Sequence, residues 1–280
     1  LLVYGNRPSL SLMHKMNLRK DRYQIKTVVH VDEGLEKILR MISSYDAVVI
    51  CDVPSPMRNQ ILKACYTEEI RVYMTPKISD ILIRSAEEIT LFDTPLIMAR
   101  NGRMPIEQAF FKRLMDIVIS GIACIVVLPF MAGTALAVKL EDGGPVLYKQ
   151  KRLTIGGREF YVYKFRSMRI DAEKDGVARL ASAGDNRITR VGNFIRKVRL
   201  DELPQLFNIL KGDMSIVGPR PERPEIAKQY ETEMPEFSYR LRVKAGLTGY
   251  AQIFGKYNTT PYDKLKLDLH YIQNYSLMLD

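Results

Sequence analysis

The sequence of 280 residues has no tryptophan, only three cysteines and only three histidines. An odd number of cysteines without CxxC spacing excludes a disulfide framework and a cysteine zinc cluster, and it indicates a reducing compartment. The histidines at positions 14, 30 and 270 share no helical turn or strand with another candidate metal ligand. Histidine-based zinc or triad chemistry is therefore disfavoured.

The first predicted domain, residues 1–93, also lacks glycines that a dinucleotide-binding turn requires. Its short apolar runs alternate with amphipathic stretches, which predicts a parallel sheet covered by helices. The turn after the first strand reads Gly5-Asn6-Arg7-Pro8-Ser9, without the second and third glycines that let a backbone approach a pyrophosphate. We expect a Rossmann-like module with degenerate nucleotide binding, used for regulation or assembly. Residues 94–108 mix proline, glycine and polar residues and predict a linker.

The net charge of +10 is concentrated in the second part of the chain. Residues 1–100 carry 14 basic and 12 acidic side chains, whereas residues 101–280 carry 28 and 20. This excess predicts an anionic partner, which is a phosphate ligand, a lipid headgroup surface or a nucleic acid. Charge alone does not distinguish these partners.

Residues 117–137 form 21 consecutive residues without a charge, which is the length that a helix needs to cross the hydrocarbon layer. Pro129 removes one backbone hydrogen bond near the middle, and basic residues flank both ends. We favour a re-entrant helix-break-helix over residues 112–139 and keep a spanning helix as the alternative. No signal peptide is recognisable, and both ends of the sequence read as cut from a longer chain.

The segments VLYKQKRL and REFYVYKF predict two strands of a small β-hairpin, since Thr154-Ile155-Gly156-Gly157 suits a turn. Helical periodicity follows from residue 187, and DELPQLFNILKG predicts a second helix whose buried stripe is Leu203, Leu206, Phe207 and Leu210. A last helix begins near Pro261 and is either interfacial or packed in the core. The fold class is therefore α/β, with a mostly helical, membrane-associated second domain at residues 109–280.

Asp201 and Glu202 are predicted at the N-terminus of the DELPQLFNILKG helix. An Asp-Glu pair at this position is either a helix cap or a catalytic pair. Arg196 lies one turn upstream, and Gly218-Pro219-Arg220-Pro221 places another arginine on a rigid turn. One carboxylate can attack phosphorus while its neighbour holds a metal ion and the arginines neutralise phosphate charge. The pattern predicts a phosphate substrate.

The second part of the chain resembles the bacterial polyprenyl-phosphate phosphoglycosyltransferases of the single-helix, re-entrant superfamily. The resemblance covers residues 109–280 through ordered motifs, among them GGPVLYKQKR, FYVYKFRSM, IRKVRLDELPQLFNILKGDMSIVGPRP and KAGLTGYAQIFG. The first 100 residues resemble the Rossmann-like domain of the larger members, which carry four transmembrane helices ahead of it. The chain departs from the family pattern at Leu128, where serine is frequent, and at Tyr250, where tryptophan is common.

This resemblance implies a sugar-phosphate transferase at the cytoplasmic face of the bacterial inner membrane. Asp201 would attack the sugar-bearing phosphorus of a UDP-sugar, UMP would leave, and undecaprenyl phosphate would accept the sugar phosphate. Glu202 would hold Mg²⁺. The implied phosphate contacts are Arg196 and Arg220, with Lys164 and Arg166 as further anion contacts or as structural residues of the loop.

Two other function classes are weighed against this one. A catalytically silent scaffold that binds anionic lipid would explain the basic surface, but not the intact Asp201-Glu202 pair. A nucleic-acid-binding protein would explain the high isoelectric point, but the sequence has no recognisable reader motif. We therefore expect the lipid bilayer and the two substrates as partners, no nucleic acid, and a possible homodimer.

Overall fold

The computed structural model describes residues 1–5, 9–99, 104–170, 172, 185–256 and 259–280. They form two compact units, Leu1–Asp80 and Ile81–Asp280. The fold is mixed α/β with a parallel sheet and one long apolar helix. The domain limits at residues 93 and 108 stay predictions.

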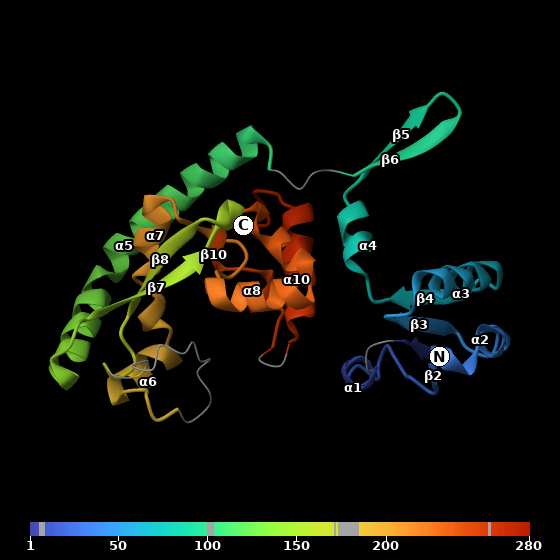
Figure 1. The fold of residues 1–280 in the computed structure, drawn as a ribbon, viewed down its shortest axis with the longest axis horizontal. Coiled ribbons are helices and arrows are strands. Elements are labelled where there is room, and N and C mark those ends of the chain that lie inside the picture. The colour runs from blue at the N-terminus through green and yellow to red at the C-terminus, as the bar shows by residue number, and fades with distance from the viewer. Residues whose placement is uncertain (6–8, 100–103, 171, 173–184, 257–258) are drawn as a thin grey trace. The chain divides into compact units, whose positions relative to one another are not determined.

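A four-stranded parallel sheet lies at the centre of the first unit (Figure 1). The strand order is β2-β1-β3-β4, and Val3 of β1 pairs with Val29 of β2 and Ile50 of β3. The strands are β1 (Leu2–Tyr4), β2 (Val28–His30), β3 (Ala47–Cys51) and β4 (Arg71–Met74). The parallel sheet predicted from alternating apolar runs is therefore confirmed, whereas its Rossmann-like character stays a prediction.

Five short helical segments accompany these strands: α1 (Leu10–Asn17), η1 (Val31–Glu33), α2 (Leu35–Ile42), α3 (Ser55–Thr67) and α4 (Ile78–Ile83). Ile38, Ile42 and Ile61 of the helices pack with the strand valines in one core. Gly5 directly follows β1. A Cβ atom at this position would lie 2.5 Å from the carbonyl oxygen of Asp52, so the neighbouring backbone excludes any side chain there. Residues 6–8 of the predicted turn lie outside the described residues.

A two-stranded antiparallel ribbon, β5 (Glu87–Leu91) and β6 (Thr94–Met98), follows α4. All ten of its residues are exposed, so no buried face stabilises it. Strand β6 occupies the first five residues of the predicted linker.

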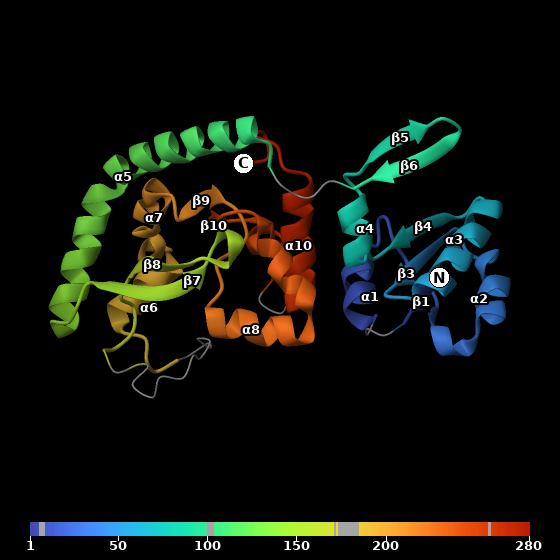
Figure 2. The ribbon, with the colours of Figure 1, turned by 45° about the horizontal axis from the view of Figure 1, so that its top comes forward.

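Helix α5 (Ile106–Asp142) contains the predicted apolar run and continues through Pro129. By length and composition it is a candidate membrane span, and only 17% of its most apolar window is buried. Figure 2 shows that α5 bends along its length, as a helix with an internal proline does. Its inner face packs through Cys124, Met131 and Val138, whereas Ile125 on its outer face is 76% exposed.

The predicted β-hairpin is confirmed as β7 (Leu147–Leu153) and β8 (Glu159–Phe165), joined by η2 (Ile155–Gly157). Gly156 and Gly157 take φ values of 68° and 75°, which explains the paired glycines of the turn. Phe160 and Val162 of β8 face a core shared with α5 and α7 (Gln205–Lys211).

The remaining elements of the second unit pack around this hairpin and α5. Strands β9 (Met214–Val217) and β10 (Ala245–Thr248) form a parallel pair. The other segments are α6 (Arg190–Lys197), η3 (Leu200–Glu202), α8 (Pro224–Glu233), η4 (Pro235–Arg242), α9 (Tyr250–Ile253) and α10 (Pro261–Gln273). Leu265, Leu269 and Tyr271 of α10 are buried, so this helix contributes to the core.

Candidate active site

Asp201 and Glu202 lie in η3, a 3₁₀ turn between α6 and α7. The prediction that they open α7 is therefore wrong. They lie in the 3₁₀ turn just before α7, whose N-cap is Pro204. Arg199 precedes the turn with a left-handed backbone (φ 63°), which reverses the chain after α6. The two carboxylates thus lie in a tight turn that connects helices α6 and α7.

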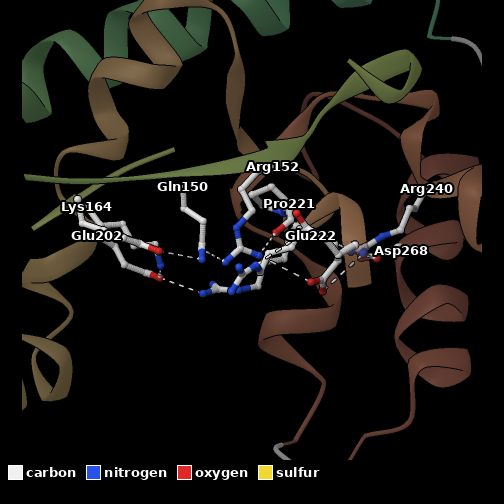
Figure 3. Close-up of polar contacts among 12 residues, drawn as sticks. Gln150, Arg152, Lys164, Glu202, Pro221, Glu222, Arg240 and Asp268 are labelled. Atoms are coloured by element: carbon white, nitrogen blue, oxygen red, sulfur yellow. Dashed lines mark hydrogen bonds and ion pairs between the residues drawn. The ribbon is translucent and has the colours of Figure 1, made fainter. Parts of the chain in front are cut away.

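Glu202 is the centre of a cluster of positive charges. Its Oε1 atom accepts hydrogen bonds from Lys164 Nζ at 2.8 Å and from Arg220 Nη2 at 3.0 Å. Arg199 Nη1 lies 3.5 Å from Oε2. The Glu202 side chain is 12% exposed, so most of this cluster is shielded from water. Figure 3 shows Lys164 and Glu202 at one end of a longer row of polar contacts.

The pKa of Glu202 reflects these neighbours. Burial alone would raise it, but the positive charges of Lys164 and Arg220 and the hydrogen bonds that they donate outweigh burial and lower the pKa to about 2. Glu202 is therefore ionised near neutral pH.

The pKa of the adjacent residue, Asp201, shifts in the opposite direction. It is 9% exposed, and burial raises its pKa, while the positive charges of Lys164 and Arg196 oppose that rise. The negative charge of Glu202 raises the pKa of Asp201 further. A carboxylate that is desolvated and beside another anion is a stronger nucleophile than one in water.

Lys164 reaches Glu202 because α7 packs against β8 through one buried amide. Asn208 Nδ2 donates to the carbonyl of Tyr161 at 2.8 Å, and Asn208 Oδ1 accepts from the backbone N–H of Tyr163 at 3.0 Å. Asn208 is fully buried. These bonds hold α7 against β8. The η3 turn, which directly precedes α7, also contacts β8, and Lys164 of that strand reaches Glu202. Burial lowers the pKa of Lys164, whereas Glu202 raises it.

Arg220 reaches Glu202 from the loop between β9 and α8, and two other arginines hold that loop. Arg240 Nη2 donates to the carbonyl of Arg220 at 2.8 Å. Arg152 Nη1 donates to the carbonyl of Pro221 at 3.0 Å (Figure 3). Each carbonyl therefore has a charged donor. The backbone on both sides of the Arg220–Pro221 bond is fixed by charge-assisted hydrogen bonds.

Two carboxylates balance these loop-holding arginines. Arg240 forms ion pairs with Asp268 at 2.8 Å and with Glu222 at 3.7 Å, and Arg152 lies 3.8 Å from Glu222. Asp268 is 1% exposed, and burial raises its pKa against the opposing charge of Arg240. No sequence pattern predicts this network, since its members come from four distant segments without a shared spacing.

The structure separates the other two predicted anion contacts. Arg196 lies in the last turn of α6, and its charge lowers the pKa of Asp201. Arg166 is buried and pairs with Asp142 at the C-terminal end of α5. Arg166 was predicted either as an anion contact or as a structural residue, and the contact that the structure shows is the ion pair with Asp142. Lys164 belongs to the Glu202 cluster.

The carboxylate pair fits a magnesium ion that takes most of its ligands from water and substrate. Among the described residues, no group of three or more His, Cys, Asp and Glu side chains gathers as a metal cage. Magnesium is usually bound through one or two carboxylates together with substrate phosphates. Within the described residues, the hydrogen bonds and ion pairs of Glu202 Oε2 involve only the exposed Arg199, so this oxygen would be the ligand for such an ion.

Comparison with known proteins gives one family and several relatives. Residues 107–280 match the family described as bacterial sugar transferase. The chain is 42% identical over 243 residues to the UDP-N-acetylgalactosamine-undecaprenyl-phosphate N-acetylgalactosaminephosphotransferase of Aeromonas hydrophila, covering 84% of this chain and 56% of the relative. It is 40% identical over 230 residues to the UDP-glucose:undecaprenyl-phosphate glucose-1-phosphate transferase of Xanthomonas campestris pv. campestris, covering 79% and 47%. The chain thus spans about half the length of these two relatives.

Proposed function

The chain belongs to the bacterial sugar transferase family, and we propose that it transfers a sugar 1-phosphate from a UDP-sugar to undecaprenyl phosphate. The names of the relatives support this substrate class. The observation that carries the proposal is the pairing of a buried Asp201 with a Glu202 that Lys164 and Arg220 surround. Such a site offers one nucleophilic oxygen beside several cations, which phosphoryl transfer requires.

In the first proposed step, an Asp201 carboxylate oxygen attacks the sugar-bearing phosphorus of the UDP-sugar. The new bond joins that oxygen to phosphorus, and the bond from phosphorus to the bridging oxygen of UMP breaks. UMP leaves with the electron pair. Lys164 and Arg220, which contact Glu202 in the structure, neutralise charge on the diphosphate as it reacts.

In the second proposed step, an oxygen of undecaprenyl phosphate attacks the phosphosugar-aspartyl phosphorus. The bond to Asp201 breaks, the carboxylate is restored, and a polyprenyl-diphosphate sugar forms. The network of Arg152, Arg240, Glu222 and Asp268 keeps Arg220 in one position through both steps.

Magnesium, held by Glu202 Oε2, would neutralise charge on the diphosphate oxygens. The chain supplies the binding carboxylate and the surrounding cations. Because Glu202 has a pKa of about 2, protons do not compete with a metal ion at neutral pH.

The contacts of α5 support a re-entrant placement in the membrane. Near its N-terminal end, Arg113 donates to the carbonyls of Ile209 and Leu210 at 2.6 and 2.7 Å, and at its C-terminal end Asp142 pairs with Arg166. Both ends of the helix therefore contact the same globular unit. A spanning helix would have its two ends on opposite sides of the hydrocarbon layer, where one globular unit does not contact both. We therefore propose that the exposed outer face of α5 enters the cytoplasmic leaflet of the bacterial inner membrane.

The direct test is UMP release from a panel of UDP-sugars that includes UDP-glucose and UDP-N-acetylgalactosamine. Without acceptor, the wild-type chain should release UMP only up to one equivalent, and undecaprenyl phosphate should restore continuous release. Asp201→Asn should release none, whereas Asp93→Asn in the exposed ribbon should behave like the wild type. Absence of release from every sugar would favour the silent lipid-binding scaffold, and full activity of Asp201→Asn would exclude the covalent mechanism.

A further inference from the structure

A cavity of about 850 Å³ lies in the second unit, apart from the Asp201–Glu202 cluster. Its walls come from the N-terminal part of α5, the turn between β7 and β8, and the segment that leads into β10. The lining residues are Met104, Ala109, Lys112, Arg113, Asp116, Ile155, Gly156, Leu241, Arg242, Val243 and Lys244. A cavity of this volume is large enough for a small organic ligand.

The lining is strongly basic, with four cationic side chains and one acidic side chain. The single carboxylate, Asp116, is already engaged, because Asp116 Oδ1 accepts from Ser215 Oγ at 3.1 Å and from the backbone N–H of Ile216 at 2.9 Å. Lys112 pairs with Asp280, and Arg113 donates to two helix carbonyls. The acid in the wall therefore balances the charge of Lys244 only in part.

Lys244 is half-buried and makes no hydrogen bond or ion pair with the described residues. Its pKa is lowered by burial and by the nearby positive charges of Arg113 and Arg158, which Asp116 and Asp213 only partly oppose. A half-buried ammonium group among other cations is costly unless an anion joins it. Arg242, stacked over the Tyr239 ring at 5.1 Å, supplies a second cation to the same wall.

The same turns of α5 also carry exposed apolar side chains. Ile106, Phe110 and Phe111 are all more than half exposed, next to the lining residues Ala109 and Lys112. A basic cavity beside an apolar strip suits an amphiphile with a charged headgroup, although a soluble anion would satisfy the cations equally well.

We propose that this cavity is a second anion site, which binds a phosphate group through Lys244 and Arg242. The phosphate belongs either to an anionic lipid headgroup or to a soluble phosphate. The site shares no side chain with the proposed transfer cluster, and its occupancy does not depend on turnover.

The test measures how fast an amine-reactive acetylating reagent modifies Lys244, read by peptide mass spectrometry. The full chain is placed in phosphatidylcholine nanodiscs, and either inorganic phosphate or phosphatidylglycerol is added. At a ligand concentration about ten times Kd, the free fraction and therefore the rate at Lys244 should fall about tenfold. Exposed Lys228 of α8 is the internal control, and its rate should stay constant.

Protection by inorganic phosphate identifies a soluble phosphate, and protection by phosphatidylglycerol alone identifies a lipid headgroup. Arg242→Gln should weaken the binding of the protecting ligand by about tenfold to a hundredfold. Arg190→Gln, on the exposed start of α6, should leave that affinity unchanged. The proposal is overturned if neither addition slows the labelling of Lys244 relative to the sample without ligand, or if Lys228 is protected in parallel.

Discussion

Replacing Lys164 by methionine should move the acid limb of the pH–rate profile to higher pH. Methionine has a similar length but no charge, so the substitution removes one of the two donors to Glu202 Oε1. At a charge separation of about 4 Å and an effective dielectric constant of about 20, this attraction is about 4 kcal/mol, or about 3 pKa units. The pKa of Glu202 should therefore rise from about 2 to about 5.

The sign of this shift follows from the same contact. Lys164 lowers the pKa of both carboxylates, so its removal makes both hold their protons at higher pH. In the wild type, Glu202 stays ionised as pH falls, and the acid limb of kcat/KM should report Asp201 alone. In Lys164→Met, protonation of Glu202 should contribute to that limb as well.

The assay is initial UMP release at low UDP-sugar concentration, measured from acidic to mildly alkaline pH. Lys164→Arg keeps the charge and is the matched control, so its limb should coincide with that of the wild type. A lost phosphate contact would lower the rate equally at all pH values, whereas a lost charge shifts the limb. If the Lys164→Met profile is lower but not displaced, the electrostatic role of Lys164 is refuted.

Three further outcomes are expected. Transfer should require Mg²⁺ and cease with a chelator, and Glu202→Gln should raise the Mg²⁺ concentration that transfer requires. Turnover in excess EDTA would refute the requirement for the metal ion. In a cysteine-free background, the substitutions Glu107→Cys and Leu140→Cys should each react with a membrane-impermeant reagent from the cytoplasmic side. Labelling of the two positions from opposite sides would mean a spanning helix. Arg240→Met leaves buried Asp268 unpaired and should cost about 3 to 5 kcal/mol, seen as a lower melting temperature. The double variant with Asp268→Leu should recover part of that loss, and an unchanged melting temperature in Arg240→Met would contradict the role of the pair.

Local patterns in the sequence predicted much of the fold. Short apolar runs that alternate with amphipathic stretches predicted the parallel sheet, and paired glycines predicted the β7–β8 turn, because both signals act within a few residues. The ribbon of β5 and β6 was missed because it has no buried face and hence no apolar alternation toward a core. The predicted buried stripe of α7 was wrong at Phe207, which is 46% exposed, since Asn208 takes the buried position against β8.

The candidate site was predictable only where its residues are close in sequence. Asp201 and Glu202 are adjacent, and the prolines around Arg220 indicate a rigid turn. The roles of Lys164 and Arg166 could not be separated, because the two basic residues are only two positions apart at the end of β8. Only the tertiary packing brings Lys164 to Glu202 and Arg166 to Asp142. The loop-holding ion pairs of Arg152 and Arg240 depend on tertiary contacts alone.

The central claim is that Asp201 carries the sugar phosphate between the two substrates. The chain should be incubated with the UDP-sugar that supports UMP release, without undecaprenyl phosphate, and then digested for peptide mass spectrometry. The account predicts a phosphosugar adduct on Asp201 that disappears when undecaprenyl phosphate is added. A chain that completes transfer with no adduct at Asp201, or with the adduct on another residue, would contradict it.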